Sequence, residues 1–232
     1  PPGVPGPAQG DRATAMALNP DLHAAERFPV QVQELDLWLR GEPFPEGHPY
    51  RGIRALPQGP TTPQVWILGS SDYGAQLAAH FGLPYAYAYF FTDGRGTEEA
   101  LSLYSRNFRP GAHHAQPMAT ICIWTLAADT EDEARRLLTT REHWRVGFEQ
   151  GLRTPLLSPE AAAAHPYTEA ERSIVQRLRE RAIVGTGEQV ATKLRELAVA
   201  FGLDEIVVNT WTHDPAARHR SYELIAKTVL NG

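Results

Sequence analysis

The residues whose types and spacing point most directly to chemistry are Gly69, Ser70, Ser71 and Gly74, which lie between an apolar run and a helical pattern. A strand that turns into a helix through small residues lets backbone N–H groups and the positive end of the helix dipole converge on an anion. The first glycine allows close approach of the backbone, the serine hydroxyls add donors, and the second glycine leaves room beside the helix. The pattern therefore predicts a phosphate site, although ordinary strand-to-helix connections use the same residues.

Four apolar runs, rich in Val, Ile and aromatic residues and mostly without polar alternation, surround this motif. They span residues 65–68, 85–91, 119–127 and 205–211. Continuous apolar runs indicate strands that are covered on both faces, and hence a parallel sheet. Helical patterns separate them, at residues 73–81, 97–107, 130–140 and onward toward 150, 168–181 and 188–201. Alternating strands and helices predict an α/β fold.

The first quarter of the chain has a different organisation. Residues 1–10 are rich in Pro and Gly, which predicts an irregular start. Residues 11–63 hold two predicted helices, 11–18 with Asp11 as N-cap and 28–40 ended by Gly41, and then a proline-rich connection. The strand and helix units follow in 64–232. We expect residues 1–232 to form a single domain.

Composition narrows the class of protein. The 232 residues carry a net charge of -5 with interspersed signs, and no apolar segment is long enough to span a bilayer, so we expect neither a nucleic-acid nor a membrane partner. The single cysteine, Cys122, lies in an apolar run and is expected to be a buried core thiol. That cysteine usage, without a secretory signal, predicts a cytoplasmic protein. His213 and Asp214 precede Pro215 in a pattern typical of a helix cap, and no metal site is predicted.

Several segments, taken in order, resemble the bacterial luciferase-like flavin-dependent monooxygenases. The most specific are 66–71 and 78–84, which contain Trp-Ile-Leu-Gly-Ser-Ser and Ala-Ala-His-Phe-Gly-Leu-Pro. Others that fall in the order of the family are 11–18, 28–35, 104–110, 127–134, 184–190, 204–208 and 220–224. The resemblance covers the chain from about residue 11 to its end.

The resemblance implies a (β/α)8 TIM barrel that binds reduced FMN at the C-terminal ends of its strands and uses O2 to oxidise an unknown small organic substrate. It further implies reduced flavin supplied by a reductase or by NAD(P)H, and a homodimer. The FMN phosphate would lie at Gly69, Ser70, Ser71 and Gly74. Candidates for the flavin and substrate pocket are Tyr89, Phe90, Phe91, Thr125, Thr210 and Trp211, for each of which filling of the core is an equally open interpretation. No catalytic residue is assigned.

The sequence also departs from the family pattern. Only the last four strand-helix units of the barrel are visible, and Pro5, Gly6 and Pro7 stand where a Gly-Arg pattern is expected. An open half-barrel would expose two unpaired edges and its inward-facing apolar side chains, so we expect upstream residues or another chain to complete the sheet. Residues 139–166 are expected to form a loop over the mouth that selects the substrate. Two alternatives stay open: a noncatalytic flavin or phosphate binder, and a deazaflavin-dependent hydride-transfer enzyme on the same fold.

Overall fold

The computed structural model describes residues 26–111, 114–152 and 155–230. Contacts divide the chain into two compact units, Pro1–Val65 and Trp66–Gly232. The division lies within two residues of the boundary that the sequence predicts between the proline-rich connection and the first strand, and the expectation of a single domain stays a prediction. The predicted helix 11–18, with its cap Asp11, lies outside the described residues.

The first unit contains the predicted amphipathic helix, α2 (Phe28–Arg40). A proline in its first turn needs no hydrogen-bond partner there, and Gly41 ends the helix in the left-handed conformation (φ 67°). The Gly41 backbone N–H donates to the carbonyls of Leu37 and Trp38. The segment after the helix packs back on it: Phe44 and Trp38 of α2 make an edge contact at 5.7 Å between ring centroids.

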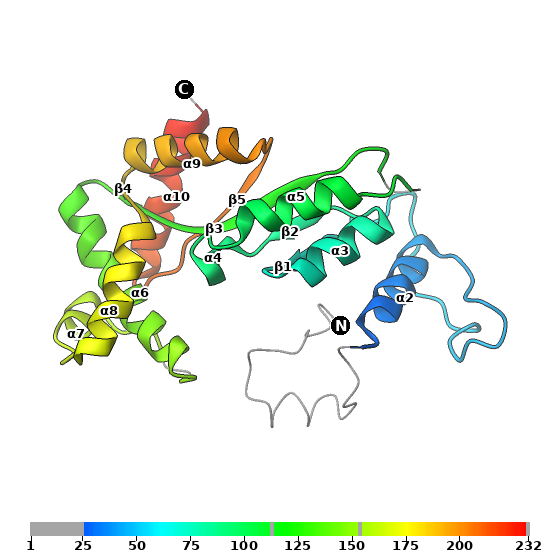
Figure 1. The fold of residues 1–232 in the computed structure, drawn as a ribbon, viewed down its shortest axis with the longest axis horizontal. Helices are drawn as coiled ribbons and strands as arrows, with labels where there is room; N and C mark the ends of the chain where they lie inside the picture. Colours follow the sequence, from blue (N-terminus) through cyan, green and yellow to red (C-terminus); the bar gives the residue numbers. More distant parts are fainter. Residues whose placement is uncertain (1–25, 112–113, 153–154, 231–232) are drawn as a thin grey trace. The chain divides into compact units, whose positions relative to one another are not determined.

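Five parallel strands form the sheet in the described part of the second unit (Figure 1). They are β1 (Ile67–Gly69), β2 (Tyr85–Tyr87), β3 (Ala119–Ala128), β4 (Ile183–Thr186) and β5 (Ile206–Asn209). The long strand β3 pairs with β2 through its first three residues, with β5 over residues 121–124 and with β4 over residues 125–128. The parallel sheet predicted from the continuous apolar runs is confirmed.

Helices connect these strands. They are α3 (Asp72–Phe81), α4 (Tyr89–Thr92), α5 (Thr97–Asn107), α6 (Glu131–Glu149), α7 (Pro159–Ala163), α8 (Glu169–Arg181), α9 (Gly187–Phe201) and α10 (Pro215–Leu230). Their starts follow local chemistry: Thr168 and Thr186 each accept from the backbone N–H three residues on and form capping boxes with Glu171 and Gln189. None of the described helices is both long and apolar enough to cross a membrane.

Three expectations about these elements need correction. β4 was not among the predicted strands, because its four residues carry two small ones and too little apolar sequence to give a pattern. The apolar run 85–91 is a strand only as far as Tyr87, and its aromatic end turns into α4. The segment 139–166 is not one loop, because α6 continues through Glu149 and α7 follows it.

Apolar side chains pack on both faces of β3. Ile123 and Ala127 lie in one cluster with Val190 and Leu194 of α9 and Ile225 of α10. Successive residues of a strand point to opposite faces, and Trp124, Leu126 and Ala128 accordingly pack with Ala134, Leu137 and Leu138 of α6. The two clusters fix the helices on either side of the carboxyl half of β3.

The sheet face that carries Leu68 of β1 and Val207 of β5 is less covered by helices than the opposite face. Leu68 is 55% exposed and Val207 is 41% exposed, whereas Ile67 is 4% exposed. Among the described strands, β1 pairs only with β2 and β5 only with β3. Each strand therefore has an edge without a partner strand in the described residues, and β5 pairs with β3 instead of with β4, its neighbour along the chain.

The thiol of Cys122 faces this less covered side, because Cys122 is the register partner of Val207. It is partly exposed, so the expectation of a fully buried core thiol is wrong. Desolvation, with a smaller contribution from Glu205, nevertheless raises the pKa of Cys122. A thiol with a raised pKa is poorly suited to act as a nucleophile.

Candidate functional site

The strand-to-helix turn predicted to bind phosphate is formed at the carboxyl end of β1. Strand β1 ends at Gly69, and Ser71 is the N-cap of α3 with extended backbone angles (φ -136°, ψ 163°). Serine at this position usually accepts a hydrogen bond from the first turn, but the Ser71 side chain does not. The start of α3 therefore has an uncommitted hydroxyl beside the positive end of the helix dipole.

Strand β2 fixes the Gly69 carbonyl. The backbone N–H of Ala88 donates to this oxygen at 2.9 Å and the Tyr85 hydroxyl donates to it at 3.2 Å. Burial raises the pKa of Tyr85 well above its ordinary range, so its hydroxyl stays protonated as a donor. The carbonyl is thus directed away from any anion at the turn.

The two glycines approach each other across the turn. A Cβ added at Gly69 would lie 3.5 Å from the Cα of Gly74, and one added at Gly74 would lie 3.6 Å from the Tyr85 ring. These are ordinary van der Waals distances, and neither glycine has a positive φ. The chain's own contacts therefore do not require glycine at either position.

The six pocket candidates separate into two groups. Tyr89 packs against the cluster that contains Ile123 and Ile183, so it fills the core on the helix-covered side. Thr125 is fully buried within β3 and not after its end, and strand alternation places it on the same face as Ile123. Its carbonyl accepts from the Thr210 hydroxyl at 2.8 Å. Thr125 and Thr210 are therefore bonded to each other within the scaffold, whereas Tyr89 both packs on the core and lines a small cavity beside Arg141.

Phe90, Phe91 and Trp211 do come together. They belong to a chain of ring contacts that runs from α4 through α6 to the segment after β5, which we call the aromatic cluster. Its members are Phe90, Phe91, Trp124, Trp144, Phe148 and Trp211, with ring centroids 4.4 to 6.0 Å apart in successive pairs. The pairs include tilted, edge and stacked contacts, and aromatic quadrupoles favour edge and offset-stacked arrangements.

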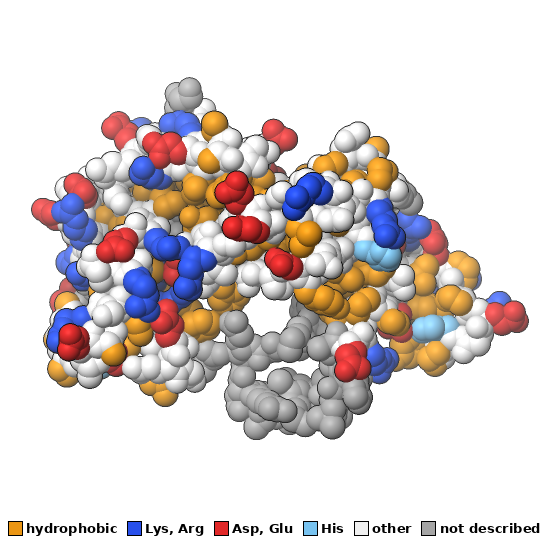
Figure 2. All heavy atoms as spheres, in the orientation of Figure 1, with side chains coloured by type: hydrophobic (Ala, Val, Ile, Leu, Met, Phe, Trp, Pro, Cys, Tyr) orange, Lys and Arg blue, Asp and Glu red, His pale blue; other side chains and the backbone are white. Residues whose placement is uncertain are grey.

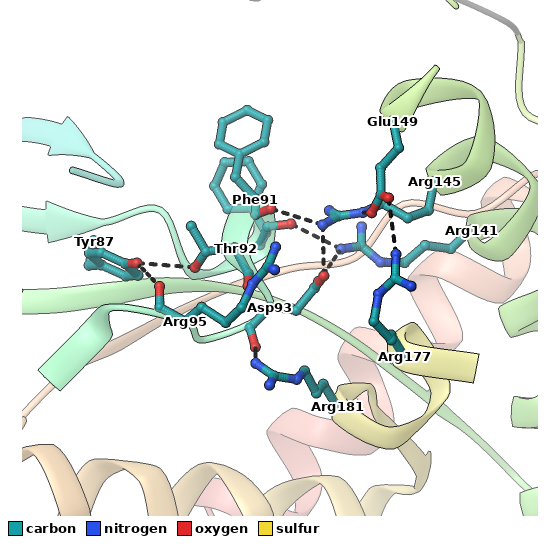
Figure 3. A network of polar contacts seen from close by, with 11 residues as sticks. Tyr87, Phe91, Thr92, Asp93, Arg95, Arg141, Arg145, Glu149, Arg177 and Arg181 are labelled. Atoms are coloured by element: carbon teal, nitrogen blue, oxygen red, sulfur yellow. Dashed lines mark hydrogen bonds and ion pairs between the residues drawn. The ribbon is translucent and has the colours of Figure 1, made fainter. Parts of the chain in front are cut away.

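Two arginines of α6 cross the aromatic cluster toward α4. Arg141 and Arg145 are 3% and 4% exposed at their side chains, and their Nη2 atoms donate to the carbonyls of Phe90 and Phe91, each at 3.1 Å. Figure 3 shows both guanidinium groups directed at Asp93, the residue that follows α4. Asp93 Oδ2 lies 2.8 Å from Arg145 Nη2. Asp93 has a left-handed backbone (φ 51°), which aspartate tolerates better than most residues.

Helix α8 adds two more arginines to this network. Arg177 pairs with Glu149 at 3.3 Å, and Arg181 donates to the Asp93 carbonyl at 3.3 Å. On the face drawn in Figure 2, Lys and Arg side chains gather over the region where Figure 1 places α6 and α8. We refer to Asp93, Arg141, Arg145, Glu149, Arg177 and Arg181 as the arginine network (Figure 3).

Comparison with known proteins decides the family. The chain matches the luciferase-like monooxygenases over residues 32–205. It is also 34% identical over 215 residues to a luciferase-like monooxygenase of Escherichia coli, an alignment that covers 92% of this chain and 62% of that protein. The chain belongs to the luciferase-like monooxygenase family. It spans about two thirds or less of the length of the curated relatives it matches, from 52% to 66%.

Solved structures agree with this family. Apo-MsnO8 superposes with a TM-score of 0.76 at 30% identity, covering 93% of this chain and 64% of that one. The oxygenating constituent of 3,6-diketocamphane monooxygenase from Pseudomonas putida, solved with FMN, superposes with a TM-score of 0.59 at 20% identity and covers 95% and 68% of the two chains. The second likeness concerns the fold alone. The chain therefore has the α/β fold of the luciferase-like TIM barrels, of which its sheet is a part.

Sequence reasoning missed most of the side chains that surround Phe90, Phe91 and Trp211. Trp124 and the α6 residues Arg141, Trp144, Arg145 and Phe148 are the missed members. One signal was present: Trp144 and Phe148 lie four positions apart, so in a helix they share one face. One local interpretation after β5 is confirmed, since Asp214 caps α10 by accepting from the Ala216 N–H at 2.9 Å.

Proposed function

We propose that the protein to which this chain belongs is an FMN-dependent monooxygenase that oxidises a small organic substrate with O2. The observation that carries the proposal is the turn after β1. There Ser71 is the N-cap residue of α3, and its side chain makes no capping hydrogen bond. Support also comes from the family and from the FMN complex of the diketocamphane enzyme. When bound, reduced flavin would supply the electrons that activate O2.

The residues of this chain would bind and orient the cofactor. Ser70 and Ser71 are the hydroxyl donors that we assign to the phosphate, together with the N–H groups at the start of α3. The glycine at position 69 presents no side chain to the phosphate, and its carbonyl is held by Tyr85 and Ala88. A phosphate needs no nearby lysine or arginine when dipoles and N–H groups converge in this way.

The aromatic cluster would supply the apolar wall of the substrate pocket. Phe90 and Phe91 follow β2 and Trp211 follows β5, and both strands end at the same edge of the parallel sheet as β1. Active sites of barrels of this type lie at that edge. An apolar wall excludes water from the reacting oxygen and limits side reactions. Reduced flavin from a separate reductase, a homodimeric assembly and a cytoplasmic location stay predictions.

The test compares FMN with riboflavin, which differ only by the phosphate. Purified chain is titrated into each flavin, and binding is followed by flavin fluorescence. We expect FMN to bind at least about tenfold more tightly, the value of one or two charge-assisted hydrogen bonds. Equal affinities would refute the phosphate assignment. Consumption of O2 by reduced FMN in the presence of the full protein then separates an enzyme from a noncatalytic binder. The same titration with a deazaflavin tests the remaining alternative, a deazaflavin-dependent hydride-transfer enzyme.

A further inference from the structure

Arg141 is a buried cation whose ion pair with Asp93 is long. Its guanidinium carbon lies 4.4 Å from the Trp124 ring centroid and 4.8 Å from that of Trp211, and because these centroids are 5.8 Å apart, the group contacts both indole rings from one side. Its nearest carboxylate oxygen is Asp93 Oδ1, 3.7 Å from Nη2 and beyond hydrogen-bond distance. The other oxygen of Asp93 is taken by Arg145. Asp93 is therefore shared by two buried guanidinium groups, and among the described residues it is the carboxylate that pairs with Arg141.

Both arginines also have donors that the described residues leave unpartnered. The Nε atom of Arg141 and the Nη1 atom of Arg145 are buried, and neither finds a hydrogen-bond acceptor in the described parts of the chain. Buried polar groups are nearly always hydrogen-bonded, and buried charges are paired. The two orphan donors come from adjacent turns of one helix, where the side chains of residues i and i+4 lie next to each other.

The wider arginine network does not neutralise these cations. Glu149 is the second carboxylate, and it is shared between Arg145 at 3.0 Å and Arg177 at 3.3 Å. Three guanidinium groups, those of Arg141, Arg145 and Arg177, thus share two carboxylates, and Arg181 adds a fourth positive charge that bonds only to the Asp93 backbone carbonyl (Figure 3). Desolvation by burial lowers the pKa of Arg141, Asp93 opposes that effect, and the charge of Arg145 adds to it. An additional negative group would relieve this excess of positive charge.

A small cavity lies beside Arg141. Its volume is about 10 Å3, and its lining includes Tyr89, Phe90, Asp93, Trp124, Arg141 and Arg181 but not Arg145, which reaches it only through the shared Asp93. That volume is close to the least that holds one water-sized atom. Asp93 is 15% exposed at its side chain and Arg181 is exposed, so the cavity lies near solvent at that side. One oxygen of a ligand fits here if the loosely held Asp93 Oδ1 moves aside.

We propose that Arg141 and Arg145 bind a carboxylate group of the substrate, with the aromatic cluster against its apolar part. The planar guanidinium matches a planar carboxylate and offers two parallel donors. The incoming carboxylate competes with Asp93, which contacts Arg141 at the longer distance of 3.7 Å. That this site binds part of the substrate rests on the proposed function. That Arg141 and Arg145 bind a carboxylate at all is a property of this chain, and it is tested without flavin.

The test uses formate, the smallest carboxylate, and the fluorescence of the tryptophans that enclose Arg141. The chain is titrated with sodium formate at constant ionic strength, with sodium chloride as the balancing salt. We expect a saturable change that fits one site, weakened about tenfold or more in Arg141→Met. Arg135→Met is the matched control, since Arg135 is an exposed arginine of the same helix, and it should bind formate as the unmodified chain does. A response that is linear, or that is the same in Arg141→Met, overturns the proposal.

A second variant keeps the test decisive if Arg141→Met fails to fold. Asp93→Asn removes the competing charge, and asparagine keeps the left-handed backbone at that position. We expect this variant to bind formate at least about threefold more tightly, because the guanidinium pair loses its internal carboxylate. Unchanged or weaker binding overturns the proposal. Normal FMN binding together with absent formate binding would refute this subsite alone, and the reverse result would refute the cofactor assignment alone.

Discussion

The turn after β1 and the cluster between α4 and α6 are built in opposite ways. The turn consists of small residues and backbone, and the Ser71 side chain at its centre makes no capping bond. The cluster consists of large side chains from four elements, joined by ring contacts and by buried guanidinium groups. Substitutions in a site made of backbone and small residues should change the stability of the fold little. Substitutions that remove one partner of a buried charge pair should destabilise the fold, because they leave the other charge unpaired.

Replacement of Arg145 tests this contrast most strongly. Arg145→Met leaves Asp93 without its 2.8 Å partner in a mostly buried position, so we expect the free energy of unfolding to fall by about 3 kcal/mol. Urea denaturation followed by circular dichroism measures it. Arg135→Met removes two exposed ion pairs within α6, those with Glu131 and Asp132, and should change stability by less than about 0.5 kcal/mol. Equal effects of the two variants would show that the buried network is not a stabilising feature.

The serine pair should show the reverse behaviour. Ser70→Ala with Ser71→Ala removes two hydroxyl donors that the chain does not use to cap α3, so stability should stay within about 0.5 kcal/mol. FMN affinity should fall about tenfold, while riboflavin affinity stays the same. Fluorescence titration with both flavins gives the two constants. A large loss of stability would mean that the serines hold the turn and are not reserved for a ligand.

Gly74 distinguishes room for a ligand from room for packing. Alanine is a better helix former than glycine, and a Cβ here meets Gly69 and Tyr85 at ordinary distances of 3.5 and 3.6 Å. We therefore expect Gly74→Ala to raise the free energy of unfolding by about 0.5 kcal/mol. Gly187→Ala is the contrasting variant, because its Cβ would lie 2.8 Å from the Leu224 carbonyl, and it should destabilise the chain. Thermal unfolding of both variants checks the sign.

The two regions also differ in how far the sequence reveals them. The turn lies within seven residues, and small residues between an apolar run and a helical pattern predict its conformation locally. The parallel sheet follows in the same way from continuous apolar runs such as 119–127. The aromatic cluster joins Phe91 to Trp211 through α6, and no local pattern encodes which face of α6 meets α4.

The failures have physical causes of the same kind. From sequence, Thr125 is assigned to the end of a strand although the apolar run continues to residue 127, and in the structure β3 pairs with β4 as far as Ala128, a pairing that joins segments 58 residues apart. Tyr89 and Phe90 are adjacent aromatic residues in the same apolar run. In α4, however, their side chains point in different directions and pack on different core clusters. Tertiary pairing decides both positions, and it is not written in local propensity.

Asp72 gives the smallest expected effect and the sharpest test of the turn. It is an acidic residue in the first turn of α3, where a negative charge interacts favourably with the helix dipole. A phosphate at the same place would compete with that charge, so Asp72→Asn should weaken the helix start slightly but tighten FMN binding by about two- to threefold.

The two signs separate a ligand site from a simple helix start. Added salt should reduce both effects, since the residue is exposed. Asp214→Asn is the matched control, because Asp214 caps α10, a helix with no proposed role in phosphate binding, and there only stability should change. If Asp72→Asn leaves FMN affinity unchanged at low salt, the phosphate does not lie at the start of α3. The turn after β1 would then not be a ligand site built from backbone.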